Sequence, residues 1–255
     1  MAHTEKQRFG GVKRLHGSNG FAKLQKAHVC VIGIGGVGSW ACETLARCGV
    51  GEITLIDADD VCVTNINRQI HALTETIGQE KVSAMAQRIH NINPDCIVNQ
   101  KTSFFLQASA DELLLAKYDY VIDAIDSIKH KTLLISMCKQ RGINIITVGA
   151  AGGKTAISGI EVKDLGLTHG DRLLSKVRAI LRKNYGFPKF AGKKFKVPAV
   201  FSAETVKLPW CDITDKSQQT SLRLDCNNGF GTDMAVISIF GITAAHHVIH
   251  QIIDT

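Results

Sequence analysis

The sequence is poor in the features that mark disordered, disulfide-stabilised or zinc-binding proteins. Only 4 of its 255 residues are proline, and it contains no low-complexity tract, which argues against long disordered segments. The 8 cysteines are scattered singly and form no C-x-x-C pair, so a tetrahedral zinc site has no support. Residues 1–28 lack an apolar core, so we expect no signal peptide and a reduced, cytoplasmic protein.

Long apolar runs are also missing. In the apolar C-terminal segment, the longest uncharged run covers residues 234–245, which is shorter than the ~20 residues that span a bilayer. We therefore predict a buried or interface helix there and no association with a membrane. His246, His247 and His250 follow at helical spacing. No further ligand type accompanies them, so core or surface histidines are favoured over a metal site.

The composition that remains is that of an ordinary globular chain, with 45% hydrophobic and 21% charged residues, and the chain is long enough to bury a sizeable core. The formal net charge of +7 fits an anionic partner or a merely soluble basic surface.

A glycine-rich turn organises the first half of the chain. The apolar run 29–32 ends at Gly33, and Gly35, Gly36 and Gly38 follow before a helical pattern begins. This is the order strand, glycine turn, helix, with the spacing G-x-G-x-x-G. Such a turn binds phosphate because backbone N–H groups and the positive end of the helix dipole can approach the anion closely.

Strands and helices alternate beyond this turn. Asp57 ends the second strand, nineteen residues after Gly38, near the position where a nucleotide-binding unit has its ribose-binding carboxylate. The pattern predicts an α/β fold of the Rossmann type, with a mostly parallel sheet and helices on both faces. Asp57, Asp123 and Asp126 should share one crevice with the glycine turn, because all of them follow strand ends. The expected strands are 29–32, 53–56, 96–98, 120–122 and 144–148, with helices at 37–47, 78–91 and 129–141.

The second half differs in character. Residues 157–162 and 205–208 look like further strands, so a C-terminal extension should complete the sheet. Between them, residues 172–196 carry nine Lys or Arg and no acid, and Tyr185, Phe187, Phe190 and Phe195 interleave with lysines. This segment predicts contact with nucleic-acid phosphates, with aromatic side chains available for stacking, although a solvated amphipathic helix is the alternative. We expect one domain, 1–255, with a nucleotide-binding core at 27–153, a basic insertion at 164–200 and C-terminal strands and helix at 201–255.

Several motifs together resemble one known family. They are G-x-G-G-x-G-S at 33–39, Asp57-x-Asp59-x-Val61, Asn65-x-Asn67-Arg68-Gln69, Gly78-x-x-Lys81 and Asp123-x-x-Asp126. Over residues 8–150 this combination resembles the ubiquitin-activating-type, ThiF-like adenylating superfamily. More narrowly, the amino-acid sequences of residues 53–72 and 224–231 resemble those of the bacterial tRNA threonylcarbamoyladenosine dehydratases. This narrower resemblance extends over essentially the whole chain. The resemblance implies ATP-dependent dehydration of the modified adenosine in tRNA through an acyl-adenylate, which then closes a ring.

The resemblance also implies roles for individual residues. Arg68, Lys81 and Asp126 are the candidate catalytic residues: the two cations would bind the ATP phosphates, and Asp126 would bind Mg²⁺. Asp57 would bind the ribose, and Asn65 would be a neutral donor near the phosphates. The full expected nucleotide-binding set is Gly33, Gly35, Gly36, Gly38, Asp57, Asp59, Asn65, Arg68, Gln69, Lys81, Asp126 and Ser127. The expected tRNA-binding set is Arg178, Arg182, Lys183, Lys189, Lys193, Lys194 and Lys196. The expected cofactors are ATP and Mg²⁺.

Partners other than tRNA follow from the same resemblance. We expect a homodimer, with residues 234–253 or a sheet edge supplying the surface, and a sulfur-relay protein is a further candidate partner. In related enzymes an arginine near the N-terminus reaches the ATP of the other subunit. Here residues 8–12 have glycine at the second arginine position, which leaves Arg8 or Arg14 for that role.

Two other functions stay open at this stage. One is an adenylating enzyme for a ubiquitin-like carrier or a sulfur-relay partner, and the second is an NAD(P)-binding protein or nucleotide-sensing module with no adenylation. The second is disfavoured because no substrate domain follows the nucleotide-binding core. Cys226 is the best candidate for a reactive thiol because it sits in a polar, glycine-rich turn, but a structural role is preferred.

Overall fold

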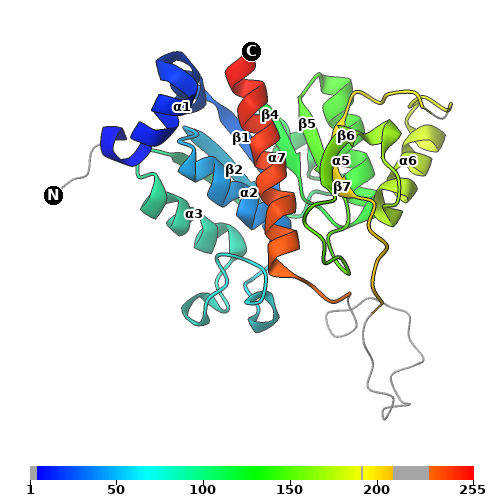
Figure 1. The fold of residues 1–255 in the computed structure, drawn as a ribbon, viewed down its shortest axis with the longest axis horizontal. Coiled ribbons are helices and arrows are strands. Elements are labelled where there is room, and N and C mark those ends of the chain that lie inside the picture. The colour runs from blue at the N-terminus through cyan, green and yellow to red at the C-terminus, as the bar shows by residue number, and fades with distance from the viewer. Residues whose placement is uncertain (1–4, 191, 209–229) are drawn as a thin grey trace, which may run out of the picture.

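The computed structural model describes residues 5–190, 192–208 and 230–255, and centres on a seven-stranded sheet (Figure 1). The strand order is β3-β2-β1-β4-β5-β7-β6, and all neighbours run parallel except β7 and β6. The strands are β1 His28–Ile32, β2 Glu52–Ile56, β3 Ile97–Lys101, β4 Tyr120–Asp123, β5 Ile145–Val148, β6 Ile160–Asp164 and β7 Pro198–Ser202. The predicted mostly parallel α/β fold is confirmed.

Helices cover both faces of the sheet, as predicted. Alternation along β1 explains this, because Val29 and Val31 pack into one core, whereas Cys30 and Ile32 pack into the other. The first core holds residues of α1, α2, α3 and α7, and the second holds residues of α4, α5 and α6. The helices are α1 Glu5–Lys26, α2 Gly36–Arg47, α3 Lys81–Ile92, α4 Ala110–Leu113, α5 Ile128–Arg141, α6 Arg172–Asn184 and α7 Met234–Asp254, with short 3₁₀ turns η1 Val63–Asn65, η2 Thr74–Thr76 and η3 Leu165–Leu167.

The apolar C-terminal segment is the core helix α7, which crosses the sheet face beside α2 and α1 (Figure 1). A Cβ at Gly241 would lie 2.2 Å from the carbonyl oxygen of Val37, so this glycine lets α7 pack directly against α2. By length and composition α7 could cross a membrane, but 50% of its most apolar window is buried inside the protein. This burial favours a core helix and leaves less of α7 free for a dimer interface than the sequence suggested.

Some sequence-based boundaries were wrong. Residues 205–208 form no strand: the chain leaves the sheet after Ser202, and the Lys207 N–H donates to the carbonyl of Gly153 instead. The strands added to the core are 160–164 and 198–202. Among the described residues of 201–255, only the last two residues of β7 belong to the sheet. The N-terminal stretch, expected as a loop or short helix, belongs to α1, a 22-residue helix kinked at Gly17. The third strand lies at Ile97–Lys101, later than expected.

Candidate functional site

A cavity of about 940 Å³ opens along the carboxyl ends of the parallel strands, where ligands bind in sheets of this type. Its walls come from the segments after β1, β2, β3, β4 and β5 and from the start of α6. Nine of the predicted nucleotide-binding residues line it: Gly33, Gly35, Gly36, Asp57, Asp59, Arg68, Gln69, Asp126 and Ser127. Three do not line it: Gly38, Asn65 and Lys81.

The glycine turn brings the start of α2 against β1. Gly33 has a positive φ of 89°, which side chains disfavour. A Cβ at Gly38 would lie 1.8 Å from the Gly33 carbonyl oxygen, so only glycine allows this approach. Gly35 is the N-cap of α2 and offers no side-chain acceptor to the first turn. The N–H groups of that turn are therefore available to an anionic ligand.

Asp57 joins this turn to the end of β2. Its Oδ2 atom accepts a hydrogen bond of 2.6 Å from the Ile34 N–H, and its Oδ1 atom accepts one of 2.9 Å from the Asp59 N–H. Burial raises the pKa of the Asp57 carboxyl group, although these N–H donors oppose the shift. Asp57 therefore holds the shape of the cavity wall, and its ribose-binding role stays a prediction.

Lys81 lies behind the cavity wall. Its Nζ atom is 2.8 Å from Asp59 Oδ2, and the lysine side chain is 8% exposed whereas that of Asp59 is 53% exposed. Asp59 thus stands between Lys81 and the cavity. Asn65 is also directed elsewhere, since its Oδ1 atom accepts a 3.1 Å hydrogen bond from the Cys62 N–H.

Arg68 and Gln69 face the cavity from the segment after η1. The Arg68 guanidinium donates to the Thr64 carbonyl and to Asn67 Oδ1, both at 2.8 Å, which holds the side chain in place. Gln69 is buried, yet its Oε1 atom has no hydrogen-bond partner among the described residues. A buried polar atom without a partner costs free energy, and the residue that carries it lines the cavity.

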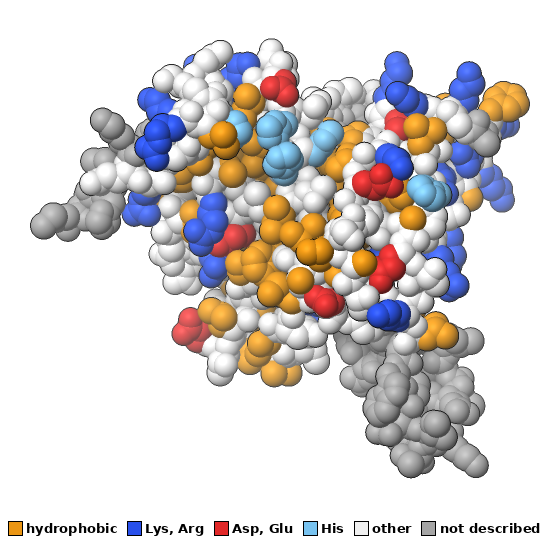
Figure 2. All heavy atoms as spheres, viewed as in Figure 1, with side chains coloured by type: hydrophobic (Ala, Val, Ile, Leu, Met, Phe, Trp, Pro, Cys, Tyr) orange, Lys and Arg blue, Asp and Glu red, His pale blue; other side chains and the backbone are white. Residues whose placement is uncertain are grey.

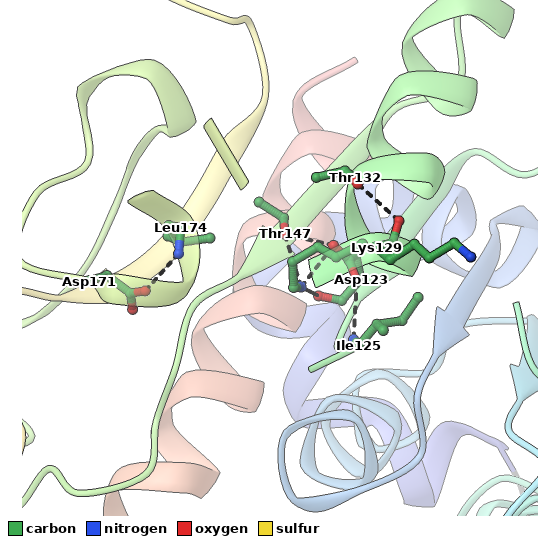
Figure 3. A network of polar contacts seen from close by, with 8 residues as sticks. Asp123, Ile125, Lys129, Thr132, Thr147, Asp171 and Leu174 are labelled. Carbon is green, nitrogen blue, oxygen red and sulfur yellow. Dashed lines mark hydrogen bonds and ion pairs between the residues drawn. The ribbon is translucent and has the colours of Figure 1, made fainter. Parts of the chain in front are cut away.

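Asp126 and Ser127 line the cavity from the loop between β4 and α5. This loop begins at a buried polar network around Asp123 (Figure 3). Lys131 Nζ donates to Asp123 Oδ2 at 2.9 Å and to Thr147 Oγ1 at 3.1 Å, and Thr147 Oγ1 donates to Asp123 Oδ2 at 2.7 Å. Asp123 Oδ1 accepts from the Ile125 N–H within the loop. The network therefore fixes the start of the loop that carries Asp126.

The far end of the cavity holds residues outside the predicted nucleotide-binding and tRNA-binding sets. Asp171 accepts from the Leu174 N–H at the start of α6 (Figure 3) and from the Ala150 N–H across the cavity wall. Lys154 donates to the Ser202 carbonyl at 2.7 Å and lies 3.5 Å from Asp171 Oδ2; burial lowers its pKa. His130, Arg172 and Lys176 also line this end. The local signal for Asp171 is that it precedes a helical pattern, as N-cap residues do. Arg172 and Lys176 belong to the basic segment 172–196, for which the sequence predicts contact with phosphates.

Part of the basic segment 172–196 packs into the protein core and is not free to contact nucleic acid. Phe187 and Phe195 were expected to be available for stacking, but both are buried in the core beneath α6, and only Phe190 of the segment's phenylalanines is well exposed. Arg182 stacks 5.2 Å from the Phe195 ring centroid, and Arg178 donates to Thr168 Oγ1. The exposed members of the predicted tRNA-binding set are Lys183, Lys189, Lys193, Lys194 and Lys196. Figure 2 shows Lys and Arg side chains gathered along the side of the molecule where α6 lies.

Other candidates lie away from the cavity or outside the described residues. No group of three possible metal ligands occurs in the part of the chain that the structure describes; His246 and His250 contact each other with ring centroids 4.3 Å apart. Cys226 and the motif residues 224–229 lie outside the described residues. Arg8 and Arg14 lie on α1, where Arg8 donates to the Ile92 carbonyl.

The sequence and the fold are similar to those of known proteins. The ThiF family model matches residues 11–254. A tRNA threonylcarbamoyladenosine dehydratase of Haemophilus influenzae is 47% identical over 247 residues, which is 97% of this chain and 94% of the relative, and its Escherichia coli counterpart is 44% identical over 96% and 93% of the two chains. The crystal structure of the E. coli tRNA N6-threonylcarbamoyladenosine dehydratase TcdA in complex with ATP superposes with a TM-score of 0.88 at 41% identity, covering 100% of this chain and 98% of that one.

The match extends across the glycine turn, the cavity and the C-terminal helix, and the coverage is nearly complete in both directions. The chain therefore belongs to the ThiF family and, within it, to the tRNA threonylcarbamoyladenosine dehydratases.

Proposed function

We propose that this chain catalyses the ATP-dependent dehydration of N6-threonylcarbamoyladenosine in tRNA. The observation that carries the proposal is the single cavity that brings the glycine turn, Arg68 and Asp126 together. The full-length similarity to a dehydratase crystallised with ATP supports the same reading.

The cavity fits ATP. The uncapped start of α2 provides N–H groups for a phosphate, and Arg68 provides a cation held by two hydrogen bonds. Asp57 lies beside the turn and would accept hydrogen bonds from the ribose hydroxyls. Residues 103–106, which follow β3, add an apolar wall suited to the adenine ring.

Mg²⁺ fits the donor set beside this site. Asp126 is exposed to the cavity and has no hydrogen bond or ion pair within the described residues, and Mg²⁺ prefers one or two carboxylates together with substrate phosphates. When bound, the ion would neutralise phosphate charge. Lys81 would act through Asp59, because their ion pair holds that carboxylate at the cavity wall.

The chemistry needs positioning more than proton transfer in its first step. The substrate carboxylate is already ionised, so it attacks the α-phosphorus of ATP without a general base; the acyl-adenylate forms and pyrophosphate leaves. The carbamoyl group of the same nucleoside then attacks the activated carbonyl carbon, loses one N–H proton and expels AMP. Both steps are accelerated by holding the reacting groups in place and stabilising phosphate charge.

The proposed partners are tRNA, a second copy of the chain and a sulfur-relay protein. The tRNA backbone is expected to contact Arg178, Arg182, Lys183, Lys189, Lys193, Lys194 and Lys196, with the five exposed lysines contributing most. The chain is expected to act in the cytoplasm and to form a homodimer. A sulfur-relay protein remains a candidate partner.

A dimer surface is available in the segment 63–77, next to Arg68. Val63, Ile66, Leu73 and Ile77 are all exposed there, and Figure 2 shows hydrophobic side chains gathered on that part of the molecule. Contiguous exposed apolar side chains mark interaction surfaces, and homodimer interfaces are more apolar than ordinary surface.

The test is mass spectrometry of tRNA nucleosides after incubation with the protein, ATP and Mg²⁺. We expect the threonylcarbamoyladenosine mass to fall by one water with release of AMP and pyrophosphate. An unchanged nucleoside with active protein would refute the proposal. Adenylation of a ubiquitin-like carrier in place of tRNA would support the alternative considered from the sequence.

A further inference from the structure

The cavity is longer than the nucleotide-binding part that the mechanism uses. Its wall follows the sheet order: residues 103–106 after β3, Asp57 after β2, Gly33 after β1, Asp126 after β4, and then 149–152 after β5. Adenine, ribose and phosphates account for the β3, β2, β1 and β4 portions. The portion from β5 to α6 is left for another group.

This remaining portion has two unpaired cations at its edge. Arg172 and Lys176 are exposed, line the cavity and have no hydrogen bond or ion pair among the residues described. Their spacing of four residues puts them on one face of α6. The opposite face is fixed, because Leu174, Val177 and Leu181 are buried in the core.

The other cation in this portion is already satisfied. Lys154 is buried, donates to the Ser202 carbonyl and lies 3.5 Å from Asp171, and Asp171 in turn binds the Ala150 N–H and the start of α6. Lys154 and Asp171 therefore hold α6 against the segment after β5. Arg172 and Lys176 are left lining the cavity with charges that no described residue pairs.

Apolar side chains accompany the two cations. Leu173, Val206 and Phe230 line the same portion of the cavity. A nucleotide within a single-stranded RNA loop presents an apolar base face and a negatively charged phosphate. This combination matches an apolar wall with cations at its edge.

We propose that the β5–α6 portion of the cavity is the subsite for the modified nucleotide of tRNA, with Arg172 and Lys176 contacting a neighbouring phosphate. The proposal rests on the proposed function and adds a location to it, since the carboxylate to be adenylated must lie beside the α-phosphate of ATP. It also separates two roles: the cavity cations position the reacting nucleotide, whereas Lys189, Lys193, Lys194 and Lys196 contribute general affinity for tRNA.

The test compares the double variant Arg172→Ala/Lys176→Ala with the control Lys139→Ala, which removes an exposed lysine at the end of α5 outside the cavity. Three quantities are measured: the affinity for ATP by calorimetry, the affinity for an anticodon stem-loop carrying threonylcarbamoyladenosine by fluorescence anisotropy at several salt concentrations, and the KM for tRNA. Circular dichroism verifies that each variant is folded.

We expect the double variant to bind the stem-loop at least about tenfold more weakly, with a smaller salt dependence, because phosphate contacts are lost. Its affinity for ATP should match the wild type, and the control should match in every measurement. Unchanged stem-loop affinity would overturn the subsite. Weakened ATP binding with normal stem-loop binding would also overturn it, by assigning the cations to the triphosphate. Because stem-loop binding is measured directly, failure of the wild type to dehydrate tRNA would refute the proposed function separately.

Discussion

The Nζ atom of Lys131 lies 2.9 Å from Oδ2 of Asp123, and neither side chain is exposed to solvent. Thr147 completes the arrangement by contacting both groups, and every contact converges at the end of β4 (Figure 3). Two opposite charges buried together cost desolvation energy, which their attraction and their hydrogen bonds offset. The site thus has a rigid charged support directly beneath the loop that carries Asp126.

Replacing Lys131 by Met should destabilise the protein strongly. Asp123 would keep a buried carboxylate without its cation, and breaking a buried pair in this way costs about 3–5 kcal/mol. Urea unfolding followed by circular dichroism measures the change. Lys129→Met is the matched control, because Lys129 is exposed on the same helix and should change stability by less than about 0.5 kcal/mol. Equal stability of the two variants would contradict a structural role for the pair.

The central part of the fold, and the cavity wall formed by the glycine turn, Asp57 and Asp126, could be predicted from local sequence signals. The glycine turn requires glycine because residues only a few positions apart come into close contact. Gly38, for example, approaches the carbonyl oxygen of Gly33 too closely for any side chain. Asp57 and Asp126 were found because strand ends mark the ligand edge of a parallel sheet. These features depend on spacing along the chain, which a sequence displays directly.

The features that sequence reasoning missed depend on contacts between distant segments. Lys154 and Asp171 meet only because α6 folds back against the segment after β5. Phe195 alternates with lysines and so looks exposed, yet the backbone N–H bonds to Asp164 turn it into the core. Residues 205–208 have strand-forming composition, but the sheet position next to β5 is already occupied by β7.

Replacing Asp126 by Asn should abolish most adenylation while the protein stays folded. The residue is exposed, so its loss has little effect on stability, but the proposed Mg²⁺ ligand is removed. Several kcal/mol of lost charge stabilisation correspond to a rate at least about 100-fold lower. Pyrophosphate release with saturating tRNA measures the rate, and Asp95→Asn is the control on an exposed carboxylate outside the cavity. A fully active Asp126→Asn enzyme would refute the magnesium assignment.

His71 should make the protein less stable as the pH falls from about 6.5 to 4. Burial, assisted by the charges of Lys81 and Arg88, lowers its pKa from 6.5 to about 4. Within that window the unfolded chain binds a proton that the folded chain does not, so stability rises with pH. The contribution is fully present above pH 6.5 and is lost towards pH 4, by about 3 kcal/mol in total.

The variant His71→Leu tests this contribution, since both ring nitrogens of His71 lack partners within the described residues. Its unfolding free energy should change less between pH 7 and pH 4.5 than that of the wild type. His90→Asn, which alters an exposed histidine on α3, should behave as the wild type does. Parallel pH profiles for all three proteins would show that His71 does not titrate as inferred.

A charge among the exposed apolar side chains of segment 63–77 should dissociate the proposed homodimer. Ile66→Asp would place a carboxylate within an apolar interface, where an unpaired charge is strongly unfavourable. Light scattering at micromolar protein should give a dimer mass for the wild type and a monomer mass for the variant. Leu15→Asp is the control, because Leu15 is also exposed but lies on α1. A monomeric wild type, or a dimeric Ile66→Asp variant, would exclude this interface.

No cysteine should be required as a nucleophile. Of the cysteines that the structure describes, none lines the cavity, and burial raises the pKa of the thiols at Cys30, Cys42, Cys48, Cys96 and Cys138, which disfavours the reactive thiolate. The activated carbonyl and its attacking group belong to the same nucleoside, and such intramolecular reactions reach effective molarities on the order of 10⁵ M or more. A covalent relay through the enzyme would add a step without increasing the rate.

The variants Cys226→Ala and Cys62→Ala test the two candidate thiols, because Cys226 is the candidate that the sequence singles out and Cys62 is the exposed thiol among the described residues. Each variant is assayed for the cyclised nucleoside with ATP as the only added cofactor. Turnover close to that of the wild type is expected for both, since ring closure needs only the adenylate and the carbamoyl group beside it. Release of AMP without cyclised product in the Cys226→Ala variant would instead require a thioester stage, because the adenylate would then form and decay without reaching the ring.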